Sequence, residues 1–205
     1  MVVGHDMTPL VDALADHGHV VVPAWLPADA VQALRADAEG LWQAGRFRHA
    51  GVGRGADFQV RPEIRSDRVL WLDDAVTTPA LDAYLGTMER LREAFNRALY
   101  LGLVEFGAHL AVYPPGAHYR PHLDHFRNTR HRVISSILYL NPPEWCAEDG
   151  GQLRVYLGRD PQGEALEVLP AGGTLVLFLA QRFWHEVLPA GRERWSITGW
   201  FCRRP

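Results

Sequence analysis

The chain contains no lysine, and all 21 of its basic residues are arginine. Against 24 acidic residues they leave a net charge of only −3 at pH 7. A protein that binds nucleic acid or an anionic membrane surface usually carries a strong positive field. We therefore expect neither a nucleic-acid partner nor a membrane partner. Arginine without lysine, in a chain rich in alanine and glycine, is typical of a GC-rich bacterial genome.

Cysteine is scarce, and long apolar runs are missing. Cys146 and Cys202 form neither a Cys-x-x-Cys unit nor the framework of a disulfide-rich secreted domain. Residues 1–7 lack the basic and apolar regions of a signal peptide. No stretch reaches the roughly 18 apolar residues of a membrane span. These absences predict a cytoplasmic protein with reduced thiols.

The length of 205 residues, with 47% hydrophobic and 22% charged residues, is that of an ordinary globular domain. We expect a single domain over residues 1–205. Within it, residues 1–100 carry the helical patterns and a glycine-rich, mobile loop at 51–55, whereas residues 104–202 carry the strands. The first part is expected to support the second and to supply a loop beside its functional site.

Helical spacing of apolar residues dominates the first part of the chain. Val31, Leu34 and Ala38 recur at that spacing in a helix that ends before Gly45. Such helices are expected to cover one face of a sheet. The elements predicted here are a helix at 8–17, a strand at 19–22, a helix at 26–44, a strand within 61–72 and a helix at about 78–98.

From residue 104 the apolar period changes to two, and proline, glycine and asparagine separate short strands. About eight short strands suit a double-sheet jelly roll, whose facing sheets can enclose a site. The predicted fold class is therefore mainly β with flanking helices (α+β), a double-stranded β-helix with the N-terminal helices packed on one sheet. The expected strands are 104–113, 118–124, 132–140, 152–156, 164–168, 174–179, 184–188 and 194–202.

Residues 122–124 read His-Leu-Asp, and His185 follows on a later predicted strand. Residues i and i+2 of a strand project to the same face, so His122 and Asp124 can both turn inward. Two imidazoles and one carboxylate on one face of Fe(II) leave the opposite positions open for an organic cosubstrate and O₂. Because the chain has 10 histidines, this short pattern is weak alone, and the residues around it decide.

Several ordered motifs surround these residues. They are Tyr113-Pro-Pro-Gly-Ala-His-Tyr-Arg-Pro-His-Leu-Asp124, Ile137-Leu-Tyr-Leu-Asn141, Gly150-Gly151, His185-Glu-Val-Leu-Pro-Ala-Gly-Arg-Glu-Arg194-Trp-Ser-Ile-Thr-Gly-Trp200 and, upstream, Ile64-Arg-Ser-Asp-Arg-Val-Leu-Trp-Leu72. Together they resemble the 2-oxoglutarate-dependent prolyl hydroxylases, above all the oxygen-sensing branch that modifies hypoxia-inducible factor and its bacterial relatives. The likeness spans about residues 64–202.

The resemblance implies an Fe(II) centre held by His122, Asp124 and His185. It also implies 2-oxoglutarate and O₂ as cosubstrates, with ascorbate as a reductant. Arg194 would pair with the buried carboxylate of 2-oxoglutarate, because such a carboxylate is costly to leave unpaired and a guanidinium offers it a planar, charged fork. Tyr139 would hydrogen-bond the same carboxylate. The other pocket residues implied are Tyr113 and Thr198.

Arg192 competes with Arg194 for this role. Arg194 lies nine residues after His185, which is the spacing of the family's 2-oxoglutarate arginine. If its strand continues to Trp200, parity also places Arg194 and Trp200 on one face. The alternative is that Arg194 belongs to a basic surface stretch and that Tyr139 is ordinary core.

The resemblance further implies a prolyl residue in a protein loop as the substrate. In bacterial relatives a translation factor such as elongation factor Tu is one target class. In the oxygen-sensing branch a loop before the barrel and an arginine after the His-x-Asp strand grip the substrate. Asp67 and Arg132 occupy comparable positions, and our hypothesis is that they pair with each other. The alternative is an exposed ion pair that contributes roughly 0–1 kcal/mol. Trp200 would close the pocket.

The implied reaction converts 2-oxoglutarate into succinate and CO₂ and inserts oxygen into an unactivated C–H bond. No acid or base of the protein is needed, because the metal carries the hard chemistry. Asp124 favours hydroxylation over halogenation, since related halogenases have a small residue in its place. Two other functions stay open. One is a hydroxylase of the same chemistry for a free amino acid or biosynthetic intermediate, and the other is a cupin-like metal-binding module without turnover.

Overall fold

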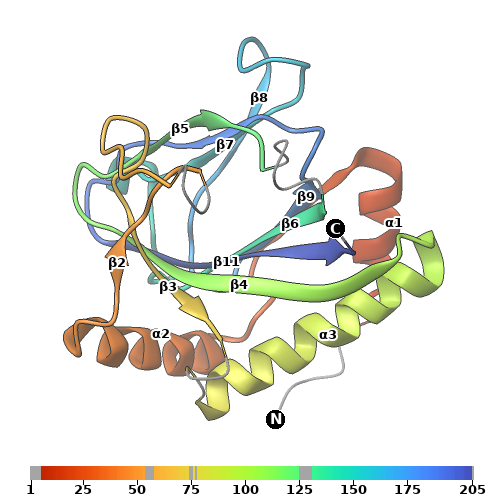
Figure 1. Cartoon of the computed structure of the whole chain (residues 1–205), viewed down its shortest axis with the longest axis horizontal. Coiled ribbons are helices and arrows are strands. Elements are labelled where there is room, and N and C mark those ends of the chain that lie inside the picture. The colour runs from red at the N-terminus through yellow and green to blue at the C-terminus, as the bar shows by residue number, and fades with distance from the viewer. Residues whose placement is uncertain (1–5, 54–57, 74–75, 77, 125–130, 205) are drawn as a thin grey trace.

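Two antiparallel sheets face each other in the computed structural model, and helices cover the outer face of the larger sheet (Figure 1). The structure describes residues 6–53, 58–73, 76, 78–124 and 131–204. The predicted fold class, a double-stranded β-helix with flanking helices, is confirmed. Within these ranges no helix combines the length and the apolar character that crossing a membrane requires.

The larger sheet has seven strands in the order β1-β9-β6-β11-β4-β3-β2. Its central strand is β11, which pairs with β4 on one side and with β6 on the other. Residues carried by β11 therefore lie in the middle of the sheet, where neighbours on both sides fix the backbone. The bounds are β1 His19–Val22, β2 Arg48–His49, β3 Arg68–Leu72, β4 Leu103–Tyr113, β6 Arg132–Tyr139, β9 Leu175–Leu179 and β11 Arg194–Arg203.

The smaller sheet has four strands in the order β5-β10-β7-β8. Strand β5 lies beside β10, and His122 is the register partner of His185. The sheet thus brings together two histidines that are far apart in the sequence. The bounds are β5 Tyr119–His122, β7 Leu153–Tyr156, β8 Ala165–Val168 and β10 His185–Val187.

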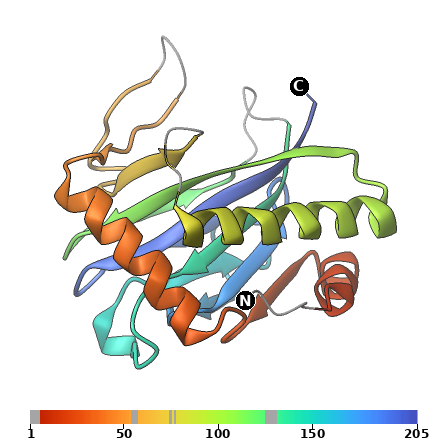
Figure 2. The same ribbon diagram turned by 90° about the horizontal axis from the view of Figure 1, so that it is seen from below.

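Helices α2 (Ala28–Gln43) and α3 (Pro79–Leu99) cross the outer face of the larger sheet (Figure 2). The start of α3 is capped by Thr78, whose hydroxyl accepts a hydrogen bond from the amide of Leu81 at 3.1 Å. Helix α1 (Thr8–His17) precedes β1 at the edge of this sheet. The helices thus leave the inner face of the larger sheet open toward the smaller one.

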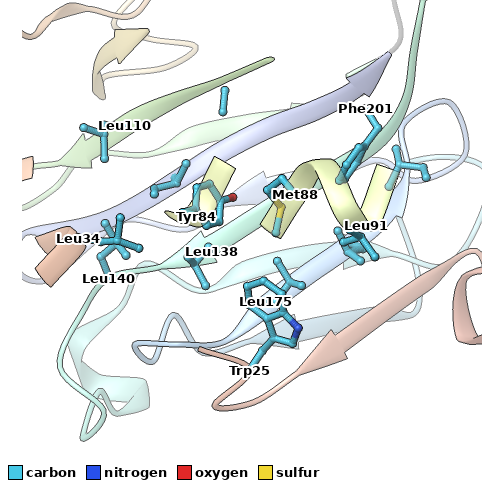
Figure 3. Packing of buried hydrophobic residues seen from close by; sticks show 14 of the residues in the cluster. Trp25, Leu34, Tyr84, Met88, Leu91, Leu110, Leu138, Leu140, Leu175 and Phe201 are labelled. Atoms are coloured by element: carbon cyan, nitrogen blue, oxygen red, sulfur yellow. The ribbon is translucent and has the colours of Figure 1, made fainter. Parts of the chain in front are cut away.

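The main core lies between the helices and the larger sheet. Met88 and Leu91 of α3 are fully buried there together with Leu34 of α2, Leu138 of β6 and Phe201 of β11 (Figure 3). A second cluster fills part of the space between the two sheets. Its members include Ile137, Tyr139, Val155, Val176 and Phe178.

Side chains of β11 alternate between these two layers, as the pleat of a strand requires. Ile197 and Phe201 belong to the helix-side core. Arg194, Thr198 and Trp200 instead line the cavity between the sheets. The prediction that Arg194 and Trp200 share one inward face is confirmed.

The strand predicted within 61–72 is found as β3, which begins at Arg68 after a turn. The strand predicted at 118–124 ends at His122, so Asp124 lies just beyond it. The geometry of Asp124 is therefore set by its contacts rather than by the pleat of a strand.

Two short elements were not predicted. They are the two-residue strand β2 and a 3-10 turn at Ala147–Asp149. Neither is long enough to carry a periodic signal. Residues 54 and 55 of the glycine-rich loop predicted at 51–55 lie outside the described residues.

Candidate metal and cosubstrate site

Three buried side chains converge between the sheets: His122 at the end of β5, Asp124 just after it and His185 at the start of β10. One ligand atom from each lies within 4.8 Å of the others. Two nitrogens and a carboxylate oxygen at this spacing can bind one divalent ion on a common face.

Both imidazoles are oriented by backbone carbonyls. Nδ1 of His122 lies 2.8 Å from the carbonyl oxygen of Arg120, and Nδ1 of His185 lies 3.2 Å from that of Phe183. If Nδ1 carries the proton and donates it, Nε2 presents a lone pair. Nε2 of His122 is 3.9 Å from Asp124 and Nε2 of His185 is 3.5 Å from it. This is how metal-binding histidines are commonly held.

Asp124 is held as an anion. Burial alone would raise its pKa, but the two imidazoles, the Arg132 guanidinium at 3.9 Å and a hydrogen bond from Ser135 outweigh burial and hold the pKa below its usual range. The Ser135 hydroxyl donates to Oδ2 at 2.6 Å. Burial and the neighbouring His185 lower the pKa of His122 well below its ordinary value. A neutral imidazole and an ionised carboxylate are the protonation states that metal binding needs.

Arg194 is only 1% exposed. Its Nε donates to the carbonyl oxygen of Gly151 at 2.8 Å, and its guanidinium carbon lies 4.8 Å and 5.0 Å from the ring centres of Tyr113 and Tyr139. In the described part of the chain no carboxylate lies within ion-pair distance of it. A buried cation without an anion is costly. The position therefore fits an anionic ligand.

Unpartnered hydroxyls lie near this guanidinium. The hydroxyls of Tyr139 and Ser196 are buried, and neither has a hydrogen-bond partner among the residues described. Burial raises the pKa of Tyr139, with Arg194 acting in the opposite direction, so the phenol keeps its proton and can donate it. A guanidinium and a neighbouring phenol fit a carboxylate group of a ligand.

Gly151 makes room for Arg194. Its backbone has φ of +70°, and a Cβ atom there would lie 2.8 Å from Cδ of Arg194. From the sequence Gly151 is no more than a turn residue. In the structure only glycine fits this position, because it allows both the positive φ and the close approach of the Arg194 side chain.

The metal ligands and Arg194 share one cavity of about 1600 Å³. The predicted pocket residues Tyr113, Thr198 and Trp200 also line it, whereas Asp67 and Tyr139 are not among the lining residues. Residues of the segment between β2 and β3 form part of its wall. These are Ala50, Gly51, Val52, Gly53, Phe58, Val60, Ile64 and Arg65.

The predicted pair of Asp67 and Arg132 is wrong. Asp67 is fully buried and accepts two hydrogen bonds from Arg65, at 2.8 Å and 2.6 Å. Arg65 and Asp67 are two residues apart on an extended segment, so their side chains can point to the same side. Arg132 instead lies 3.5 Å above the ring of Trp200 and 3.9 Å from Asp124.

The two candidate arginines are clearly separated. Arg192 is 44% exposed and pairs with Asp149 at 3.3 Å, while Arg194 points into the cavity. Glu186 lies outside the metal cluster and pairs with Arg154 at 3.1 Å. Arg194 is thus the arginine of the cavity wall.

Sequence reasoning missed a histidine of the cavity wall. His109 is 4% exposed and packs against Trp71 and Trp200, with ring centroids 5.0 Å and 5.5 Å away. Burial, reinforced by the charge of Arg65, lowers its pKa to about 3. The strand parity that places Tyr113 inward also places His109 inward, and this signal could have found it.

Residues 108–202 match the sequence profile of the family described as the 2OG-Fe(II) oxygenase superfamily. The chain is also 45% identical to a Pseudomonas putida prolyl-4-hydroxylase of known crystal structure. That similarity covers 96% of this chain and 99% of the other, with a TM-score of 0.86. The chain belongs to the prolyl 4-hydroxylase family of 2OG-Fe(II) oxygenases. The resemblance read from the motifs is confirmed.

More distant relatives of this prolyl 4-hydroxylase family member are longer proteins. It is 28% identical to the hypoxia-inducible factor prolyl hydroxylase of Caenorhabditis elegans, over 94% of this chain and 27% of the relative. It is 28% identical to human Egl nine homolog 1, over 94% of this chain and 45% of the relative. The chain therefore spans about a quarter to a half of these relatives' length.

The cofactor and cosubstrates of a 2OG-Fe(II) oxygenase fit the residues present. The donor set of His122, Asp124 and His185 suits Fe(II). The buried guanidinium of Arg194 and the unpartnered hydroxyl of Tyr139 suit a carboxylate such as that of 2-oxoglutarate.

Proposed function

We propose that this chain is an Fe(II)- and 2-oxoglutarate-dependent dioxygenase that hydroxylates a prolyl residue in a protein substrate, with release of succinate and CO₂. One observation carries the proposal. A buried His-Asp-His donor set and a buried arginine that has no carboxylate partner in the described chain share a single cavity.

Fe(II) at this site, together with 2-oxoglutarate and O₂, would supply the oxidising power to hydroxylate an unactivated C–H bond. The protein's own contribution is to position these groups and to keep the carboxylate ligand ionised. His122, Asp124 and His185 would hold the metal. Arg194 would bind the far carboxylate of 2-oxoglutarate, and Tyr139 would donate its phenolic proton to the same group.

Strand β11 runs along the cavity from one end to the other. Arg194, Thr198 and Trp200 follow one another on its inner face. A strand rises about 3.3 Å per residue, so Arg194 and Trp200 are roughly 20 Å apart along it. Arg194 would thus mark the cosubstrate end and Trp200 the substrate end. Thr198 would line the middle of the cavity, and Tyr113 would pack beside Arg194.

The cavity mouth favours a protein substrate over a small molecule. Phe58, Val60 and Trp71 are 49%, 47% and 36% exposed, and all three line the cavity. Exposed apolar side chains around an opening are typical of a surface that receives a macromolecule. The volume of about 1600 Å³ also exceeds the roughly 300–1,000 Å³ of most small-molecule pockets.

The cosubstrate role of Arg194 is tested by succinate formation from 2-oxoglutarate under Fe(II) and O₂, without any substrate. Arg194→Met should raise the KM for 2-oxoglutarate at least about 30-fold, the equivalent of about 2 kcal/mol for an unpaired buried carboxylate. Arg192→Met is the matched control and should leave the KM unchanged. Equal KM values in both variants would contradict the assignment, and no succinate from the wild type would favour the cupin-like module.

The substrate is tested on the proteome of the organism that encodes the chain. Peptide mass spectrometry should find a prolyl residue that gains one oxygen only when enzyme, Fe(II) and 2-oxoglutarate are present, with translation factors such as elongation factor Tu among the candidates. Succinate formation stimulated by free amino acids or biosynthetic intermediates, and not by protein, would support the small-molecule hydroxylase instead.

A cytoplasmic location, a bacterial origin and stimulation by ascorbate are further parts of the proposal.

A further inference from the structure

Three planar groups are stacked at the candidate metal site, and one of them is the imidazole of His122. The rings of Tyr119 and His122 have centroids 3.5 Å apart and planes only 14° apart. The guanidinium carbon of Arg65 lies 4.3 Å from the centre of the Tyr119 ring. Two groups cannot occupy one face of a ring at such distances, so Arg65 and His122 lie on opposite faces of Tyr119. The order is guanidinium, phenol, imidazole.

A β-bulge makes this stack possible. Residues three apart in a regular strand, as Tyr119 and His122 are, point to opposite faces. Here His122 is paired with His185 and Tyr119 with Val187, so three steps along β5 oppose two along β10. The extra residue twists the strand and turns both rings to one side. Pro121 lies within the bulge, where the missing amide proton is tolerated.

Arg65 is fixed in place from two directions. Its Nε and one terminal nitrogen donate to the two carboxylate oxygens of Asp67, which is fully buried. Its backbone forms a bridge with Tyr119, and the amide of Arg120 donates to the carbonyl of Ile64 at 2.9 Å. The segment that precedes β3 thus lies along β5 (Figure 1). A guanidinium held in this way is a rigid support for the Tyr119 ring.

We propose that Arg65 and Tyr119 are positioning residues that fix the plane of the His122 imidazole and thereby set the affinity for the metal. The hydrogen bond from Nδ1 to the Arg120 carbonyl fixes one direction of the ring. The stack with Tyr119 fixes the rotation about that direction. The inference rests on the proposed metal site. It assigns the segment that contains Arg65 and Asp67 to the support of the metal centre rather than to substrate binding.

The test is binding of Mn(II) to the metal-free protein by calorimetry, without substrate or O₂. Tyr119→Leu removes the planar partner of His122 and should weaken Mn(II) binding about 10- to 100-fold, as loss of an outer contact to a metal ligand does. Tyr119→Phe keeps the ring and should bind Mn(II) like the wild type. Tyr119→Met fills similar space without a plane, should behave like Tyr119→Leu, and decides the question if the leucine variant does not fold.

Each result supports or overturns the inference. Wild-type affinity in Tyr119→Leu and Tyr119→Met, with a change only in the KM of the protein substrate, would make Tyr119 a substrate contact and overturn it. An equal loss in Tyr119→Phe would assign the effect to the hydroxyl and also overturn it. A wild type that binds no Mn(II) would contradict the proposed function itself, which is a different failure.

Discussion

At the scale of single residues, the proposed cosubstrate end of the cavity depends on a glycine as well as on an arginine. Arg194 supplies the charge, and Gly151 supplies both a hydrogen-bond acceptor for it and the space in which its side chain lies. A side chain at position 151 would displace the guanidinium from the cavity wall without removing it. The two effects of such a change, on the backbone and on Arg194, can be separated by a matched substitution elsewhere.

Gly151→Ala should raise the KM for 2-oxoglutarate about tenfold, because a Cβ atom 2.8 Å from Cδ forces Arg194 to move. Gly163→Ala is the control, since Gly163 has a similar φ of +79° with nothing within 4 Å of the added atom. Both variants should lose about 1 kcal/mol of unfolding free energy from backbone strain. Steady-state kinetics and urea unfolding check this, and an equal rise in KM in both variants would rule out the steric explanation.

His109 gives the fold a specific pH dependence. Burial first, and then the charge of Arg65, lower its pKa to about 3. The unfolded chain, with a histidine pKa of about 6.5, therefore binds this proton more readily than the folded one, and stability falls as the pH drops below about 6.5. Between pH 7 and pH 5 the wild type should lose about 2 kcal/mol more than His109→Leu. Urea unfolding of the metal-free proteins measures this, and identical losses would refute it.

At the scale of elements, the helices support the sheet, and no described helix residue belongs to the metal cluster or lines the cavity. Helix α3 buries Met88 and Leu91 against the outer face of the larger sheet, whereas the metal ligands come from the smaller sheet and its loop. Loss of packing under the larger sheet should therefore reduce stability without a direct effect on the site.

Met88→Ala should lower the unfolding free energy by about 2–5 kcal/mol, because Met88 is fully buried and leaves a cavity. Glu93→Ala on the exposed side of the same helix should change it by less than about 0.5 kcal/mol. The KM for 2-oxoglutarate should stay at the wild-type value in both. A raised KM in folded Met88→Ala would contradict the supporting role of the helix.

The alternation of side chains along a regular strand predicted the positions of several site residues. It failed where strands are irregular. It placed Arg194, Thr198 and Trp200 on one face because β11 is long and regular. It could not place Tyr119, because the bulge in β5 reverses the parity between Tyr119 and His122. Bulges leave no periodic signal in a single sequence.

Side-chain partners were the other limit of sequence reasoning. Asp67 and Arg132 were paired from their positions relative to the metal motif, but Asp67 bonds to Arg65, its near neighbour. Which of several arginines a carboxylate meets depends on turns and side-chain rotamers, and the composition of a motif does not specify these. Arg132 was predicted in the right region and with the wrong partner.

At the scale of the whole molecule, two sheets of different size create the conditions for the proposed chemistry. The larger sheet contributes Arg194 and Trp200, and the smaller sheet contributes His122 and His185. Neither sheet alone holds both the histidines of the metal cluster and Arg194. These two sets of groups are expected to act on one 2-oxoglutarate molecule at one metal.

The most direct test is turnover under ¹⁸O₂ with Fe(II), 2-oxoglutarate and a substrate protein found by proteome screening. Succinate should carry one ¹⁸O atom, a prolyl residue should gain one oxygen, and the two products should form in equal amounts. Arg194→Met should form little of either at ordinary 2-oxoglutarate concentrations, whereas Arg192→Met should match the wild type. Succinate without ¹⁸O, or no succinate from the wild type, would contradict the proposed reaction.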